Sequence, residues 1–199
     1  MTLSKSEKTS EFIVKRVAPL FNQRGYVGTS MSEITQITGL TKGAIYGNFK
    51  NKEELAFEAF AYNVNMVVDK IREVVKDEVK GVDQLMAVVD FYRNYEEHLA
   101  DLGGCPVLNF GVDANNQNPV MLKRVQEIVD KLQGYIVKML EVGIADKAIK
   151  SNIDTKLYAQ KIYTLIQGAV FMAFTMEDSN YLHMMMDHVD DLIEQELKV

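Results

Sequence analysis

Two short helical segments joined by a tight turn, in the first quarter of the chain, constrain its fold most. Ser30 and Glu33 have the spacing of a capping box, in which the serine hydroxyl accepts from the third helical amide and the glutamate reaches back. Gly39 ends that helix, and Thr41 is suited to cap a second one over 42–48. A helix, a short turn and a second helix at this spacing predict a helix-turn-helix.

Helical periodicity dominates the rest of the sequence as well. Apolar residues recur every three or four positions, no long segment alternates as a β-strand does, and three prolines are spread over 199 residues. Gly25, Asn51 and Asp154 stand at expected helix boundaries. The sequence therefore predicts an all-α fold of about nine helices: 6–24, a helix after Ser30, 42–48, 52–77, 82–101, a helix opening at Pro106, 119–142, 155–177 and 180–197.

The first three predicted helices each carry an apolar face. Pro19 lies within the first face, so a kink is expected there. Thr35 and Thr38 are polar residues of the second helix, and their hydroxyls can bond back to its backbone. The residues expected to point inward are Phe12, Ile13, Val17, Leu20 and Phe21, then Met31, Ile34 and Ile37, and then Ala44, Ile45 and Phe49.

Charge is divided unevenly along the chain. Residues 1–52 contain eight basic and three acidic residues, a net charge of +5, whereas residues 53–199 contain 14 basic and 25 acidic residues, a net charge of −11. A basic head on an acidic body indicates that only the head meets a polyanion. A chance excess of lysine on a surface helix would give the same numbers, so charge alone leaves the partner open.

The segment that follows the turn carries residue types that contact DNA. Thr41 and Lys42 can reach phosphates and base edges, and Gly43 permits close approach of the backbone. Tyr46 lies one turn beyond Lys42, where its ring can pack on a sugar or a thymine methyl. Each residue alone has a structural explanation, such as capping or packing, but the group predicts a DNA-reading surface. Three further candidates stand at helix starts, where backbone amides favour an anion: Thr29, Ser30 and Lys52.

The stretch TSMSEITQITGLTKGAIYGNFKNKEEL, residues 29–55, resembles the N-terminal signature of TetR-type transcriptional regulators. In place of the family's alanines this chain has Thr35 and Thr38, and Asn48 stands where the family has a His or Tyr that is expected to contact phosphate. The matching positions are Thr29, Ile34, Gly39, Leu40, Thr41, Gly43, Ile45, Tyr46, Phe49, Lys52 and Leu55.

The resemblance implies a ligand-responsive transcriptional regulator, usually a repressor, that binds double-stranded DNA as a homodimer. It implies a helix-turn-helix DNA-binding domain over 1–52 and a ligand-binding and dimerisation domain over 53–199, with 155–177 and 180–197 pairing across the dimer. Helix 155–177 is apolar all round, which independently indicates burial between two bodies, although a central helix of a monomer would share that pattern. A two-fold dimer predicts a palindromic operator.

The sequence gives few signals for the site of a small-molecule effector. Eleven Met, nine Tyr and nine Phe can line an adaptable cavity, although such residues more often form plain core. Cys105 opens a helix, where amides stabilise a thiolate, and some TetR-type regulators sense electrophiles through a cysteine at such a junction. A buried cysteine without chemistry is the alternative. Candidate effector contacts are Tyr92, Tyr95, Cys105, Asn109, Phe110 and Tyr163.

Two other classes of function compete with DNA binding. An enzyme needs a catalytic constellation, and this chain has three His, one Cys, and neither a phosphate-binding loop nor a nucleophile elbow. A helical scaffold would leave the basic head without a role. His183 and His188 are five residues apart, not the four of a shared metal site on a helix, so neither a metal nor another cofactor is expected. No apolar run reaches transmembrane length, and we expect a cytoplasmic protein without a membrane partner.

Overall fold

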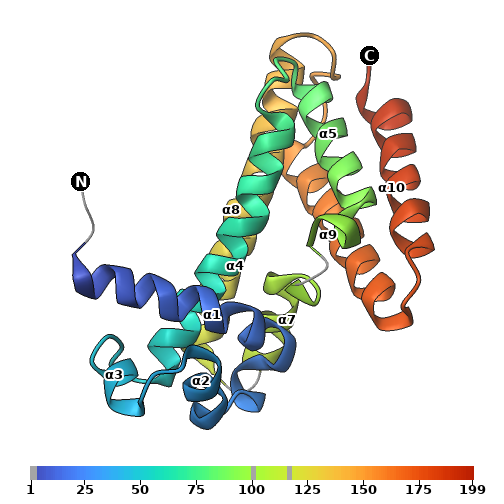
Figure 1. Cartoon of the computed structure of the whole chain (residues 1–199). Coiled ribbons are helices and arrows are strands. Elements are labelled where there is room, and N and C mark those ends of the chain that lie inside the picture. The colour runs from blue at the N-terminus through green and yellow to red at the C-terminus, as the bar shows by residue number, and fades with distance from the viewer. Residues whose placement is uncertain (1–3, 100–101, 116–117) are drawn as a thin grey trace. The chain divides into compact units, whose positions relative to one another are not determined.

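The computed structural model describes residues 4–99, 102–115 and 118–199, and within them the chain is all-helical, as predicted. Figure 1 follows ten α-helices along the described chain. They are α1 (Lys5–Gly28), α2 (Met31–Thr38), α3 (Lys42–Tyr46), α4 (Lys52–Val75), α5 (Gly81–Arg93), α6 (Tyr95–Leu99), α7 (Pro106–Ala114), α8 (Pro119–Ala145), α9 (Thr155–Met176) and α10 (Asn180–Leu192), and the π-helical turn Ile193–Leu197 follows α10.

The predicted helix over 82–101 is interrupted, which gives one helix more than expected. Asn94 leaves the helical region, with φ −108° and ψ 25°, and separates α5 from α6. Its side-chain amide donates to the carbonyl of Asp90, 3.0 Å away. A side chain that bonds back to the preceding turn competes with continued helix, which accounts for the break.

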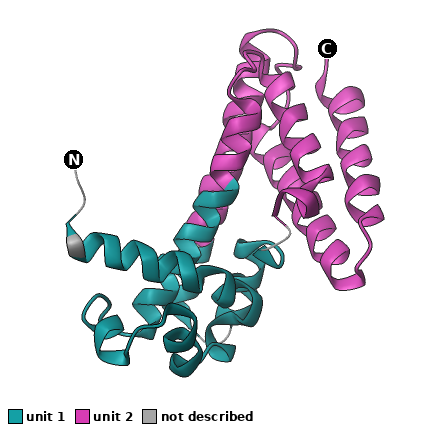
Figure 2. Cartoon of the chain, viewed as in Figure 1, with its two compact units in different colours: residues 1–67, 101–125 teal, residues 68–100, 126–199 magenta. Residues whose placement is uncertain are grey.

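The chain divides into two compact units, coloured separately in Figure 2. Unit 1 comprises Met1–Val67 and Asp101–Val125, and unit 2 comprises Val68–Ala100 and Gln126–Val199. Unit 1 therefore contains α7 as well as α1–α3, while α4 and α8 contribute residues to both units. The boundary at residue 52 between a DNA-binding and a ligand-binding domain stays a prediction, because a contact-based division does not assign functions.

Most of the predicted core of the first three helices is buried. Ile13, Val17, Phe21, Ile34, Ile45 and Phe49 are all buried, and Leu20 and Met31 are half-buried. Three expectations were wrong: Phe12 and Ile37 are each 42% exposed, and Ala44 is exposed. Ala44 lies on the outer side of the five-residue α3, whose buried residue is Ile45. Phe12 packs instead against the Arg16 guanidinium, which lies 5.7 Å from its ring centre.

The predicted caps form in the structure. Ser30 and Glu33 make both bonds of the capping box, and the Thr41 hydroxyl accepts from the Ala44 amide at 3.2 Å. Asn51 accepts from the Glu54 amide at 2.8 Å and so starts α4. The hydroxyls of Thr35 and Thr38 donate to the carbonyls of Ser32 and Ile34, each at 2.7 Å, which confirms that they bond back to their own helix.

Two asparagines attach α7 and the turn before it to α1. The buried Asn22 amide donates to the carbonyls of Leu102 (2.6 Å) and Gly104 (3.2 Å). Asn109 of α7 donates in return to the Asn22 carbonyl at 3.0 Å. The Asp113 carboxylate accepts from the Tyr26 amide, and the rings of Phe60 and Phe110 stack with centroids 4.5 Å apart. These contacts explain why residues far along the chain belong to unit 1.

In unit 2, α5 and α8 cross at two glycines. A Cβ added at Gly81 would lie 2.2 Å from the Met139 carbonyl oxygen and 2.3 Å from the Gly143 nitrogen. Both atoms belong to the backbone, so the crossing requires glycine at position 81. Across the same unit, Arg93 of α5 pairs with Asp187 and Asp190 of α10, with its Nη2 atom 3.0 and 2.5 Å from their carboxylates.

We predict that Gly81→Ala lowers the free energy of unfolding by about 1–3 kcal/mol, the usual cost of forcing extra atoms into a packed site. Gly134→Ala is the matched control, because a Cβ at Gly134 in α8 meets nothing within 4 Å. That change should raise stability by about 0.5–1 kcal/mol, since alanine is the better helix former. Urea denaturation of both variants measures the effects. Equal stability of Gly81→Ala and the parent chain would contradict the close crossing.

Candidate nucleic-acid interface and effector cavity

The helix-turn-helix presents one side of α3 to solvent. Gly39 adopts a left-handed conformation with φ 69°, which turns the chain sharply between α2 and α3. Ile45 and Phe49 are buried and fix α3 to unit 1. On the opposite side, Tyr46 is 46% exposed. Four of the predicted DNA contacts are thereby exposed together on one short segment: Thr41, Lys42, Gly43 and Tyr46.

Asn48, directly after α3, is engaged within the protein. Its amide nitrogen donates to the Ala44 carbonyl at 2.9 Å, and its amide oxygen accepts from the Ser10 hydroxyl of α1 at 3.1 Å. The residue is half-buried. Asn48 therefore joins the beginning of α1 to the end of α3 and helps to hold the exposed face in place.

The other three predicted contacts stand near the starts of α2 and α4. Ser30 is exposed, and its hydroxyl caps α2. Thr29 is fully buried, and its hydroxyl donates to the Gly25 carbonyl at 2.8 Å. Lys52 donates to the Tyr26 carbonyl and lies 4.4 Å from the centre of the Tyr26 ring; its burial lowers the pKa of the ammonium group. The side chains of Thr29 and Lys52 thus hold unit 1 together.

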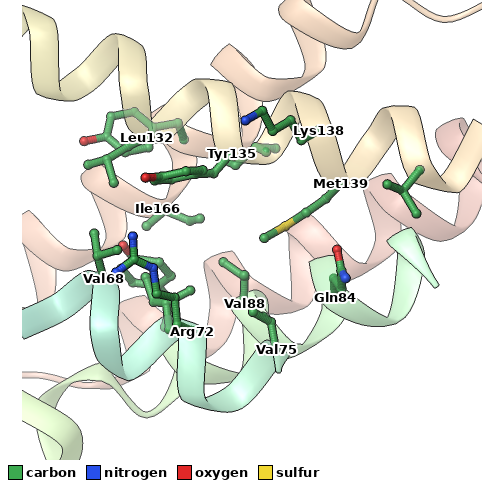
Figure 3. Close-up of a pocket in the computed structure, with 15 residues that line it drawn as sticks. Val68, Arg72, Val75, Gln84, Val88, Leu132, Tyr135, Lys138, Met139 and Ile166 are labelled. Carbon is green, nitrogen blue, oxygen red and sulfur yellow. The ribbon is translucent and has the colours of Figure 1, made fainter. Parts of the chain in front are cut away.

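Unit 2 contains a largely apolar cavity of about 240 Å³, shown in Figure 3. It lies among the parts of α4, α5, α8 and α9 that belong to this unit. The residues that line it are Val68, Ile71, Arg72, Val75, Gln84, Val88, Tyr92, Leu132, Tyr135, Ile136, Lys138, Met139, Val142, Tyr163 and Ile166. A largely apolar pocket with a few polar groups is typical of a small-molecule site.

The cavity includes two of the six predicted effector contacts, Tyr92 and Tyr163. Tyr95 does not line it; that ring is fully buried and stacks on Tyr92 with centroids 5.4 Å apart. The other three, Cys105, Asn109 and Phe110, lie in unit 1, where Asn109 and Phe110 attach α7 to its neighbours. Cys105 is 7% exposed and stands at the N-terminus of α7, where its side chain makes no capping bond.

Sequence reasoning missed the polar residues of the cavity: Arg72, Gln84, Tyr135 and Lys138. Each stands in a long helix, where a single polar residue has the same pattern as the solvated face. The signal available was weak, because an inward polar residue stands out only once the packing of four helices is known. Within the described part of the chain, no three His, Cys, Asp or Glu side chains lie close enough together to bind a metal ion.

None of the helices among residues 4–99, 102–115 and 118–199 combines the length and hydropathy that a bilayer span requires.

Both the N-terminal and the C-terminal part of the chain match known protein families. Residues 13–59 match the family described as bacterial regulatory proteins, tetR family, and residues 81–189 match the tetracyclin repressor-like C-terminal domain. A TetR-family regulator from Cytophaga hutchinsonii has 31% identity and a TM-score of 0.95, over 100% of this chain and 99% of that one. A TetR regulator from Chloroflexus aurantiacus J-10-FL has 33% identity and a TM-score of 0.93, over 99% and 100% of the two chains.

A curated relative from Bacillus subtilis (strain 168), the fatty acid metabolism regulator protein, is 23% identical over 171 residues, which cover 85% of this chain and 84% of that protein. The two family matches together span most of the chain and include the helix-turn-helix described above. This chain therefore belongs to the TetR family of helix-turn-helix transcriptional regulators, a family that binds DNA and is not enzymatic.

Proposed function

We propose that this protein is a repressor that binds a palindromic operator as a homodimer and leaves it when a small molecule occupies unit 2. The observation that carries the proposal is the exposed face of α3. It presents Lys42 and Tyr46 on a helix that Ile45 and Phe49 anchor from the other side. The major groove of DNA accommodates a short, rigidly held helix that carries exposed hydrogen-bond donors.

The exposed residues at the start of α3 and within it have two roles. Thr41 and Lys42, at the N-terminus of α3, are placed for phosphates and base edges, and Gly43 leaves room for the backbone to approach. Tyr46 supplies a flat apolar ring with a hydroxyl. Asn48 and Lys52 support this surface through their bonds within unit 1, and Thr29 is left out of the proposed interface because its side chain is buried.

Exposed apolar side chains on α9 and α10 support a homodimer through these helices. Phe171 is 48% exposed, and Leu157 and Met184 are exposed as well. Gly168 is exposed one turn before Phe171, and a Cβ there would meet nothing within 4 Å. Large apolar side chains beside a small residue allow a second helix to pack closely. Two copies related by a two-fold axis would place two α3 helices on a palindrome, one or more helical turns apart.

The cavity of unit 2 supports effector control, with α4 as the element that conveys it. This helix starts at Lys52, beside the helix-turn-helix, and its last two turns supply Val68, Arg72 and Val75 to the cavity. An effector that favours one position of these turns would alter the spacing of the two heads, and by no more than its preference for that state allows. Release by an electrophile at Cys105 has less support, because the residue is buried.

We predict that the double variant Lys42→Ala/Tyr46→Ala loses at least tenfold in operator affinity. Losing one base-edge contact typically costs about 1–3 kcal/mol. The slope of log affinity against log salt should fall by about 0.9 for each phosphate contact removed. The operator is first obtained by selecting bound duplexes from a random pool, and gel-shift titration then measures the variant. Lys70→Ala is the control, because Lys70 is an exposed lysine of α4 that lies outside the helix-turn-helix. Unchanged affinity of the double variant would place the interface elsewhere.

We predict that Phe171→Glu turns the dimer into a monomer, because a carboxylate would be buried without a partner at the interface. Val112→Glu is the control, since Val112 is an exposed apolar residue on α7, 69% exposed against 48% for Phe171. Sedimentation velocity at micromolar concentration distinguishes the two species. A parent chain that sediments as a monomer, or a Phe171→Glu variant that stays dimeric, would contradict pairing through α9.

A further inference from the structure

We propose that the cavity of unit 2 selects an amphipathic acid, with its carboxylate at Arg72 and Tyr135 and its apolar part among the aliphatic side chains. This inference rests on the proposed function in one respect, namely that this cavity is the effector site. It goes further by assigning the sign of the ligand's charge, the end of the cavity where that charge lies, and the size of the apolar part.

The charge of the lining is opposite to that of its surroundings. Residues 53–199 carry a net charge of −11, yet the fifteen lining residues include Arg72 and Lys138 and no Asp or Glu. Both cations are exposed and water screens their charges at a distance, so they act on a ligand through direct, charge-assisted hydrogen bonds. Such a lining favours a ligand with a negative group over a neutral one, and disfavours a cation.

The Arg72 guanidinium and the Tyr135 hydroxyl lie at one end of the cavity (Figure 3). Figure 3 shows Arg72 and Tyr135 reaching toward the end beside Val68 and Leu132, while Gln84 lies at the other end. Hydrogen bonds to Asp69 and to the Tyr135 side chain raise the pKa of the Arg72 guanidinium, so it stays charged. Lys138 follows Tyr135 by three residues on α8 and is exposed. A carboxylate at this end can meet the Arg72 guanidinium and the Tyr135 phenol (Figure 3).

The partner that Arg72 already has does not block this role. Arg72 Nη1 lies 2.7 Å from the Asp69 carboxylate, in a pair whose side chains are both more than 60% exposed. Exposed ion pairs of this kind contribute little to stability. A guanidinium has five N–H donors in a planar fork, so groups remain for a ligand carboxylate.

The remaining surface of the cavity sets the apolar part of the ligand. Val68, Val88, Leu132, Met139 and Ile166 supply side chains that hydrogen-bond to nothing, so the ligand there must be hydrocarbon. A cavity of about 150 Å³ accepts a benzene ring. By that measure the 240 Å³ found here has room for roughly ten carbon atoms. Decanoate is therefore a suitable probe.

The test measures binding of three ten-carbon probes to the full chain by isothermal titration calorimetry without DNA. The probes are decanoate, decanol and decyltrimethylammonium, each below its micelle-forming concentration. We expect decanoate to bind at least tenfold more tightly than decanol, and the ammonium compound to bind most weakly. Equal affinities for decanoate and decanol, or tighter binding of the cation, would overturn the proposal.

Variants of exposed side chains locate the carboxylate. Arg72→Gln should weaken decanoate about tenfold, the usual loss of one charge-assisted contact, and leave decanol unchanged. Lys138→Gln should have a smaller effect than Arg72→Gln, because Figure 3 places its amine away from Arg72. Lys70→Gln on α4 and Lys131→Gln on α8 are matched controls, because both are exposed and neither lines the cavity. If the controls weaken decanoate as much as Arg72→Gln does, the effect is a general one of charge and the assignment is wrong.

Operator binding separates this inference from the function it deepens. A chain that binds decanoate selectively but prefers no DNA duplex would refute the regulator and leave the cavity assignment standing. A chain that binds its operator but does not distinguish decanoate from decanol would refute the cavity assignment alone.

Discussion

The proposed DNA-reading surface depends on the burial of two side chains, Ile45 and Phe49, that support a helix too short to be stable alone. An isolated helix shorter than about 12–15 residues is marginal in water, and α3 has five. Thr41 satisfies one free amide at its start, while Ile45 and Phe49 remove apolar surface from water. Lys42 and Tyr46 are thus held in position by the buried side chains of Ile45 and Phe49, so the geometry of the exposed surface depends on the core beneath it.

The second constraint is the polar junction between α1 and the segment before and within α7. A buried asparagine amide is costly unless its donors are used, and Asn22 uses them on the carbonyls of Leu102 and Gly104. Gly103 and Gly104 have φ values of 74° and 102°, a conformation that favours glycine, so this turn is specified by sequence as well as by its partners. Within unit 1, any displacement of α7 must therefore break hydrogen bonds to α1 or carry α1 with it.

Local signals were sufficient to predict most of the helices, though not the break at Asn94, and tertiary contacts decided the rest. Caps such as Ser30 and Asn51 act within four residues, so their roles could be read from spacing and are confirmed. Phe12 and Ile37 fit the apolar periodicity of their helices but lie beyond the edge of the core. Periodicity alone does not show where the buried part of an apolar face ends. The membership of α7 in unit 1 and the polar lining of the cavity depend on contacts between segments far apart in the sequence, such as that of Asn22 with Leu102, 80 positions on, which no local pattern encodes.

The crossing of α5 and α8 bears on how such a protein changes its ligand over evolutionary time. At Met139 the carbonyl oxygen is pressed against Gly81, whereas the side chain of the same residue lines the cavity. The backbone at Met139 is fixed by the crossing, whereas its side chain can be replaced by another without disturbing that contact. A substitution of the residue 139 side chain can therefore change the shape of the cavity, and with it the ligand that the cavity would accept, while the contact of Gly81 with the α8 backbone keeps the two helices in place.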